Sequence, residues 1–184
     1  MQPRKQHLID TALNLFNQYG YHATGIDLIL AQSKVSKATL YKHFRSKEEL
    51  ILAVLQQRDE QVLTELKEKI EKKDQRGESE ILAIFDHLDE WFNSELFFGC
   101  NFINATAEYA DPNHPIKVFS AQHKRSIVNL MKEILLKKEI DHVDEVANQL
   151  DLLIEGAIVM AHTRGMKEAA LIAKGMAERL LAMA

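Results

Sequence analysis

Apolar residues recur at steps of three and four along most of the chain, which is the spacing of one face of an α-helix. The pattern is most regular near the C-terminus, where one stripe runs from Val143 to Ala161 and another from Ala169 to Leu181. No segment alternates apolar and polar residues with the period of two that marks a half-buried strand. Seven Gly and three Pro among 184 residues also leave little material for hairpin turns. These features predict an all-α protein of about nine helices.

The composition predicts a globular protein without a membrane span. Apolar residues make up 46% of the chain and charged residues 27%, as in ordinary folded domains. The length allows one domain or two small ones. No run of about 18 apolar residues is present, so we expect no transmembrane helix. The N-terminal residues lead into an amphipathic segment instead of an apolar signal sequence, and we therefore expect a cytoplasmic protein.

Charge is distributed unevenly along the chain, although the net charge is only −4. Residues 1–47 contain seven Lys and Arg against two Asp, a balance of +5, whereas the remainder carries 16 basic and 25 acidic residues. A basic head on an acidic body indicates that the head meets a polyanion. A solvated charged surface would give the same pattern.

The N-terminal quarter predicts two short helices between two longer ones. Thr24 is placed as the N-cap of a helix over residues 26–32, and Ser36 as the N-cap of a helix over residues 37–43. Ser46 with Glu49 has the sequence of a capping box at the start of a longer helix. Two short helices joined by a tight turn are typical of a helix-turn-helix unit.

The second short helix has the chemistry of a DNA recognition helix. Its capped N-terminus would direct free backbone N–H groups at phosphate. Small or hydrogen-bonding residues at its start, here Lys37, Ala38 and Thr39, would let the backbone enter the major groove. Basic and phenolic side chains that could reach backbone phosphate follow at Tyr41, Lys42 and Lys47.

Residues 35–50 follow the pattern V-S-K-x-T-L-Y-x-H-F-x-S-K-E-x-L, preceded by Gly-Tyr-His-Ala-Thr-Gly-Ile at residues 20–26. This stretch resembles the DNA-binding domain of the TetR family (TetR/AcrR-like) of transcriptional regulators. The resemblance implies a homodimer whose heads enter successive major grooves of a palindromic double-stranded DNA operator. It implies DNA contacts from Thr24, Lys34, Ser36, Lys37, Ala38, Thr39, Tyr41, Lys42, His43 and Lys47. Thr24, Ser36, Tyr41 and Lys47 would contact phosphate, whereas His43 would support the helix.

Two positions depart from the family pattern. Lys34 stands where the family usually has a turn glycine, so that either Lys34 adopts a left-handed conformation or the turn differs. Ala38 stands where glycine is common, and its methyl group could contact a thymine methyl. A second stretch, residues 99–115, is similar to a segment in one subgroup of TetR-like regulators.

The body of the chain predicts further helices. Beyond Leu66 the sequence becomes charged, and we expect a linker near residues 72–78. Apolar spacing then predicts a helix from Ile81 to near Gly99 and a short helix from Phe102 to Tyr109. Asp111-Pro112 offers the next helix start, with Pro115 as a competing start.

Six of the 13 aromatic residues lie between residues 91 and 109, interleaved with polar groups. From the residues alone, filling of the core is the simpler interpretation. An apolar cavity with a few convergent polar groups is also what a small-molecule site requires, and the family resemblance implies such a site. The candidate effector-binding residues are Trp91, Phe98, Phe102, Asn104, Glu108, His123 and Met160.

The two C-terminal stripes predict a homodimer. A helix as apolar as residues 143–161 must bury more than one side, and two such helices can form a four-helix bundle with their symmetry mates. The alternative is burial within one subunit. The candidate interface residues are Val146, Leu150, Ile154, Ala157, Ile158, Ala161, Ile172, Met176 and Leu180.

Other chemistry has little support in the sequence. Cys100, the single cysteine, excludes a disulfide framework within the chain and is more typical of a small buried hydrophobe than of a redox sensor. No two of the eight His are spaced to form a metal site on one helix, and no catalytic or phosphate-binding motif is present. We therefore expect no metal, no cofactor and no enzymatic activity.

The sequence thus predicts a helix-turn-helix DNA-binding domain at residues 1–47 and a helical effector-binding and dimerisation domain at residues 48–184. The predicted function is transcriptional repression at a palindromic operator, relieved by a small-molecule effector, although no residue distinguishes repression from activation. The alternative is a helical ligand-binding protein or enzyme whose head no longer binds DNA.

Overall fold

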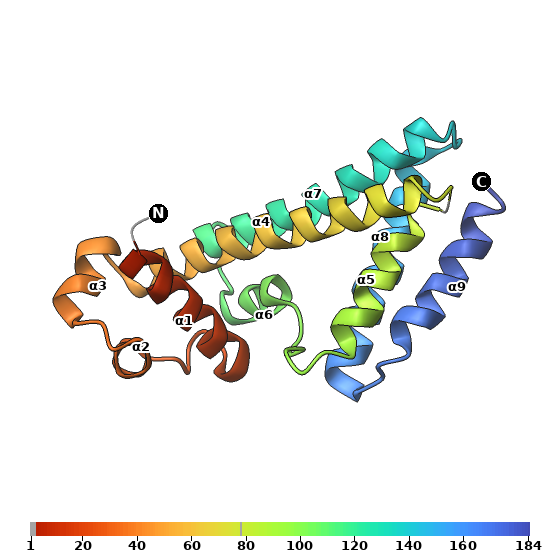
Figure 1. Cartoon of the computed structure of the whole chain (residues 1–184). Helices are drawn as coiled ribbons and strands as arrows, with labels where there is room; N and C mark the ends of the chain where they lie inside the picture. Colours follow the sequence, from red (N-terminus) through yellow and green to blue (C-terminus); the bar gives the residue numbers. More distant parts are fainter. Residues whose placement is uncertain (1–2, 78) are drawn as a thin grey trace. The chain divides into compact units, whose positions relative to one another are not determined.

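The apolar stripes of the sequence form helices throughout the part of the chain that the structure describes. The structure is a computed structural model that describes residues 3–77 and 79–184. Within these residues there are nine helices and no strand, so the predicted all-α fold is confirmed (Figure 1). The helices are α1 (Pro3–Tyr19), α2 (Ile26–Ser33), α3 (Lys37–His43), α4 (Lys47–Asp74), α5 (Leu82–Phe92), α6 (Asn101–Glu108), α7 (Pro115–Lys137), α8 (Val143–Arg164) and α9 (Ala169–Leu181).

The chain divides into two compact units. The first contains the chain up to Glu60 together with Cys100–His123, and the second contains Gln61–Gly99 and Lys124–Ala184. Both α4 and α7 begin in the first unit and end in the second. The first unit therefore contains the whole basic head, the first half of α4, helix α6 and the start of α7.

In the first unit, α2 and α3 both pack against α1. Helix α1 buries Leu8, Ala12 and Phe16, which are almost inaccessible to solvent, whereas Tyr19 near its end is 57% exposed. Side chains from the following elements complete this core, namely Ile29, Leu40, Phe44, Leu50 and Val54. The interlocked apolar side chains fix α3 on its scaffold and leave its opposite face exposed.

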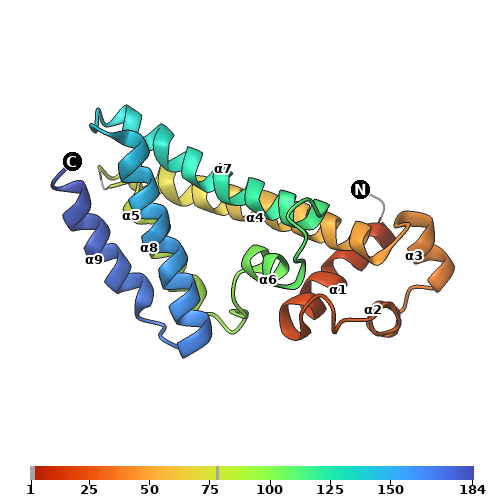
Figure 2. The same cartoon turned by 180° about the vertical axis from the view of Figure 1, so that it is seen from behind.

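In the second unit, α9 packs along both α5 and α8, and α5 also contacts α8 (Figures 1 and 2). The small alanine side chains of α9 allow its neighbours to approach closely, and Ala169, Ala170, Ala173 and Ala177 are all buried. Gly165 ends α8 in the left-handed conformation, with φ 65°, which suits glycine at this position.

The end of α5 differs from the sequence-based expectation, and the start of α7 is one of the two that the sequence left open. The helix expected to reach Gly99 ends at Phe92, where the Asn93 side chain donates a hydrogen bond to the Asp89 carbonyl (2.9 Å) and the chain turns. Phe97 then packs edge-on against Trp91, with ring centroids 5.0 Å apart. Of the two possible starts of the next helix, the structure has the one at Pro115, where α7 begins. The Asp111 carboxylate instead accepts a hydrogen bond from Asn113 N–H (2.9 Å) in a turn. No helix among the described residues is long and apolar enough to cross a bilayer.

Candidate nucleic-acid interface

The turn between α2 and α3 is closed by a left-handed lysine. Lys34 has φ 56° and ψ 22°, and its N–H donates to the Leu30 carbonyl (3.0 Å). Of the two conformations that its sequence left open, Lys34 therefore adopts the left-handed one. The Ser33 hydroxyl accepts a hydrogen bond from Val35 N–H (3.3 Å) and supports the same turn.

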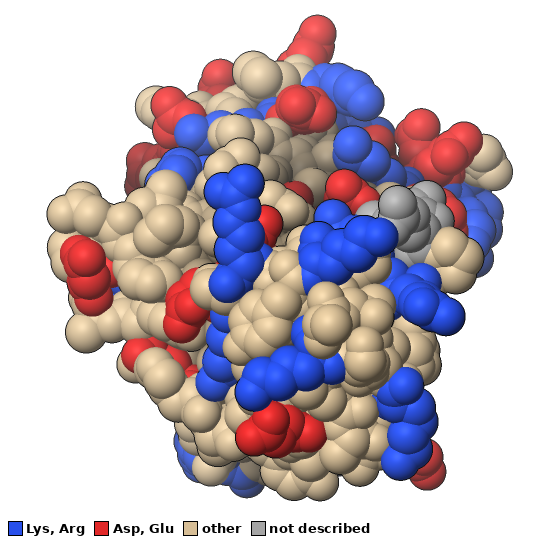
Figure 3. Space-filling view, turned by 90° about the vertical axis from the view of Figure 1, so that its left-hand side faces the viewer, with Lys and Arg blue, Asp and Glu red and all other residues tan. Residues whose placement is uncertain are grey.

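Helix α3 is capped and presents a basic face to solvent. Ser36 accepts a hydrogen bond from Thr39 N–H (3.2 Å), as expected of an N-cap. Leu40 and Phe44 anchor the inner side of this segment in the core. Its outer side carries the exposed residues Lys37, Ala38, Tyr41 and Lys42. Figure 3 views the side of the molecule that carries α2 and α3, and Lys and Arg side chains project from it.

Lys47 and His43, two other predicted DNA-binding residues, are partly buried in the head. The Lys47 ammonium donates to the His22 carbonyl (3.2 Å), and burial lowers the pKa of Lys47 although Glu48 and Glu108 act in the opposite direction. The His43 ring lies edge-on to Phe44, with centroids 6.4 Å apart, which is consistent with support of α3. Lys47 therefore also holds the α1–α2 turn against the start of α4.

The structure corrects the role expected of Thr24. Its side chain is 0% exposed, and its hydroxyl donates to the carbonyl oxygens of Gly20 (2.7 Å) and Leu15 (3.2 Å). The N-cap residue of α2 is Gly25 instead. Because both its burial and its hydrogen bonds direct it inward, the Thr24 side chain cannot contact phosphate in this conformation.

The capping box at the start of α4 forms with one change of partner. Ser46 accepts a hydrogen bond from Glu49 N–H (3.2 Å), as its sequence predicts. The Glu49 carboxylate accepts from Arg45 N–H (2.6 Å), one residue before the serine.

The candidate effector-binding residues fall into both units. Phe102, Asn104, Glu108 and His123 belong to the first unit, whereas Trp91, Phe98 and Met160 belong to the second. Phe102 and His123 are buried and stack face to face, with centroids 3.6 Å apart. Glu108 binds backbone N–H groups of the α1–α2 turn, at Tyr21 and His22. Sequence reasoning missed this role because the contact joins positions more than 80 residues apart.

The candidate dimer residues of α8 lie inside the second unit. The six candidates on this helix are each at most 5% exposed, namely Val146, Leu150, Ile154, Ala157, Ile158 and Ala161. These residues are therefore buried within one subunit, which is the alternative that the sequence left open for this stripe. Ile172 and Met176 of α9 are 49% and 44% exposed, as an interface requires. Leu152 of α8 is 73% exposed. It was missed because it lies outside the regular apolar stripe, beside the polar residues Gln149 and Glu155.

A groove of about 130 Å³ lies between α8 and α9, beside these exposed residues. It is lined by apolar side chains and one glycine, including Leu152, Gly156, Met160, Ile172 and Met176. The exposed apolar surface of the second unit is therefore continuous over both C-terminal helices.

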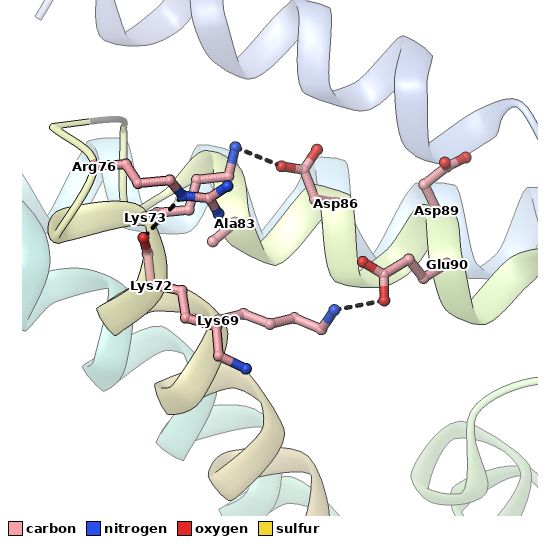
Figure 4. A pocket seen from close by; sticks show the side chains of 8 residues that line it. All are labelled: Lys69, Lys72, Lys73, Arg76, Ala83, Asp86, Asp89 and Glu90. Atoms are coloured by element: carbon pink, nitrogen blue, oxygen red, sulfur yellow. Dashed lines mark hydrogen bonds and ion pairs between the residues drawn. The ribbon is translucent and has the colours of Figure 1, made fainter.

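A larger, charged pocket of about 490 Å³ lies between α4 and α5 (Figure 4). Basic residues of α4 face acidic residues of α5, and Lys73 pairs with Asp86 (2.9 Å). Burial acts to raise the pKa of Asp86, but hydrogen bonds from Lys174 and Lys73 lower it below its usual value. The opposite charges thus largely satisfy one another across the pocket. Among the described residues, no group of three or more His, Cys, Asp or Glu is placed to bind a metal ion.

Comparison with known proteins supports the interpretation of the head. The family model described as bacterial regulatory proteins, tetR family, matches residues 8–54. The HTH-type transcriptional regulator YjdC of Escherichia coli is 25% identical over 155 residues, which cover 84% of this chain and 81% of YjdC.

Similar structures extend the likeness to almost the whole chain. SCO4454, a TetR-family transcriptional regulator from Streptomyces coelicolor, superposes with a TM-score of 0.87 at 29% identity, over 97% of this chain and 94% of SCO4454. The multidrug binding protein EbrR, solved in complex with malachite green, has a TM-score of 0.77 over 97% of this chain and 98% of its own. At 16% identity, the likeness to EbrR is one of fold.

Proposed function

The chain belongs to the TetR family of bacterial transcriptional regulators with a DNA-binding helix-turn-helix, and we propose that it is a repressor that binds a palindromic operator as a homodimer. A small-molecule effector releases it from the DNA. Residues 1–47 bind DNA, and residues 48–184 bind the effector and form the dimer. Because its partner is DNA, the protein acts in the cytoplasm.

The observation that carries the proposal is the exposed face of the capped helix α3. Lys37, Ala38 and Lys42 lie on it and read base edges, together with Thr39 at the first turn. Ser36 leaves the N-terminal backbone N–H groups of α3 directed outward, where phosphate binds. Tyr41 and Lys47 add further contacts to phosphate beside these base-reading residues. This assignment omits Thr24, whose side chain is buried.

The proposed dimer forms through the exposed apolar side chains of α8 and α9. Leu152, Val159, Ile172 and Met176 are large apolar residues open to solvent in the single chain. Two copies of this surface related by a two-fold axis would bury each other's apolar side chains. Binding to half-sites one helical turn apart would require the two heads of the dimer to lie about 34–36 Å apart.

The proposed effector is recognised in the body of the protein. The candidates are Phe102, Asn104 and His123 in the first unit and Trp91, Phe98 and Met160 in the second. A structural neighbour, the multidrug binding protein EbrR, was solved in complex with malachite green. We assign Glu108 a different role below, because its carboxylate is engaged by the head.

Selection of duplexes from a random DNA library by the purified protein tests the proposal. We expect enrichment of a palindrome with half-sites one helical turn apart. Binding should weaken by about 10³-fold or more between 50 and 200 mM salt if about six phosphates are contacted. Lys37→Ala should reduce discrimination between the selected site and random DNA, whereas Lys67→Ala, an exposed lysine of the second unit, should not. A folded dimer that enriches no sequence would contradict the proposal and favour an idle head.

A further inference from the structure

Helix α6 is attached to the α1–α2 turn at both of its ends, and all of these contacts lie within the first unit. At its N-terminal end, the Asn101 side-chain amide donates to the Asn17 side-chain oxygen of α1. The Tyr21 hydroxyl donates to the Asn101 carbonyl (3.1 Å), and the Tyr21 side chain is buried. These contacts fix the start of α6 against the end of α1.

At its C-terminal end, α6 contributes a carboxylate that accepts two backbone hydrogen bonds. Glu108 Oε1 accepts from Tyr21 N–H (2.8 Å), and Glu108 Oε2 accepts from His22 N–H (2.6 Å). Hydrogen bonds to an ionised acceptor are about twice as strong as neutral ones. The carboxylate also approaches Gly20 so closely that a Cβ atom there would lie 3.0 Å from Oε1, and Gly20 has a φ of +85° that favours glycine.

The backbone of His22 is held on both sides of its Cα atom. Its N–H is bound by Glu108, and its carbonyl accepts a hydrogen bond from Lys47 of α4 (3.2 Å). The His22 ring lies 3.0 Å from Glu108 Oε2, measured from Nδ1, and stacks on Tyr109 with centroids 5.0 Å apart. Only two residues separate His22 from Gly25, the N-cap of α2. The position of the His22 backbone therefore determines where the helix-turn-helix begins.

The opposite side of α6 is fixed by a buried contact to α4 and α7. His123 of α7 stacks on Phe102 with an interplanar angle of 10°, and its Nδ1 lies 2.6 Å from the Asp59 carboxylate of α4. Helix α6 is therefore held between the interior of the first unit on one side and the α1–α2 turn on the other.

We propose that Glu108 is a positioning residue for operator recognition, which holds the α1–α2 turn so that α2 and α3 are presented to DNA in the orientation that binds the operator. The proposal rests on the proposed function, because it concerns the same DNA-binding head. Glu108 does not contact DNA and acts through the α1–α2 turn, by its hydrogen bonds to two backbone N–H groups and its contact with the His22 ring. Loss of the Glu108 contacts would let the α1–α2 turn sample several conformations. Contacts to base edges, which need one orientation of α3, would weaken more than non-specific contacts to phosphate.

The test compares Glu108→Gln with the wild-type dimer in binding to the selected operator and to a scrambled duplex. The amide keeps the size of the side chain but offers one oxygen to two N–H donors. We expect operator affinity to fall about tenfold or more, which is the worth of a hydrogen bond to a charged acceptor, with binding to the scrambled duplex unchanged or stronger. Amide hydrogen exchange at Tyr21 and His22 should become faster in the variant. Because the substitution removes a negative charge, simple electrostatics would strengthen binding to both duplexes.

Glu60→Gln is the matched control, since it removes the same charge from an exposed position of α4 in the same unit. If Glu108→Gln does not fold, Tyr21→Phe carries the test, because it removes only the hydroxyl that bonds to Asn101 at the other end of α6 and should also lower specific affinity. Unchanged operator affinity would overturn the inference, and so would an equal loss on both duplexes with a lowered melting temperature. If the wild-type protein itself binds no operator, the proposed function fails instead.

Discussion

Asp151 of α8 is a carboxylate in an unfavourable position. Its Oδ1 is buried, and within the described part of the chain it has no hydrogen-bond partner. Burial, and then the charge of Glu155, raise the pKa of Asp151, while Lys124 acts in the opposite direction. Because the folded pKa lies above the unfolded value of about 3.9, the folded state binds more protons and stability falls as pH rises from about 4 through the folded pKa.

We therefore expect Asp151→Asn to stabilise the protein at pH 7.5. An amide carries no charge into this site, and a gain of about 1 kcal/mol would raise the melting temperature by about 2–4 °C in a chain of this size. Thermal melts followed by circular dichroism should show that this advantage shrinks as the pH approaches 4, where the wild-type carboxyl becomes protonated. Asp141→Asn, at an exposed aspartate, is the control. A lower melting temperature for Asp151→Asn would mean that the carboxylate has a stabilising partner.

Single residues were predictable where their partners are close in sequence. Ser36 caps α3 through an N–H three residues away, and such a contact can be inferred from spacing alone. Thr24 has the same local signal, but carbonyl groups at the end of α1 and in the α1–α2 turn bind its hydroxyl instead. Glu108 was assigned to a ligand pocket because nothing in the sequence indicates that α6 returns to residues 21 and 22.

The turn between α2 and α3 contains one residue, Lys34, whose backbone conformation lowers the stability of the fold. For a residue with a side chain, the left-handed conformation of Lys34 costs about 1–2 kcal/mol. Lys34→Gly removes this strain, although glycine loses more backbone entropy on folding, by about 0.5–1 kcal/mol. We expect a small net stabilisation, measured as a higher urea midpoint with an unchanged m-value.

Lys37→Gly is the matched comparison for Lys34→Gly. It removes the same charge three residues later, at the first position of α3, where the backbone is helical. Glycine there should destabilise the protein by up to about 1 kcal/mol, so the two substitutions should shift the urea midpoint in opposite directions. A lower midpoint for Lys34→Gly would show that the lysine side chain makes a contact worth more than the strain.

At the level of whole helices, apolar periodicity predicted which elements exist better than where they end. The short helix expected from Phe102 to Tyr109 is α6, displaced by one residue. The end of α5 depends on Phe97 folding back on Trp91. Because Phe97 is apolar, the sequence pattern alone predicted that the helix continued through it. The start of α7 depends on whether Asp111 caps a helix or a turn, and both uses have the same local sequence.

The organisation of the whole molecule depends on which apolar side of α8 faces inward. The sequence showed that this helix is apolar on more than one side, but two apolar sides of one helix cannot be ranked by their composition. Packing against α5 and α9 buries the more regular stripe, including Ile154 and Ile158. The side that contains Leu152 is left exposed, and it is the surface that we propose for dimer formation.

We expect Leu152→Glu and Met176→Glu each to convert the dimer to folded monomers. Each charge would be present twice in a two-fold interface and would lose its hydration there, so the dissociation constant should rise by more than about 100-fold. Light scattering coupled to size-exclusion chromatography measures the mass, and circular dichroism verifies the fold. Leu136→Glu, a comparably exposed leucine of α7, should leave the dimer intact, whereas Ile154→Asp should destabilise the subunit itself. A dimer that survives both Leu152→Glu and Met176→Glu would place the interface on another surface.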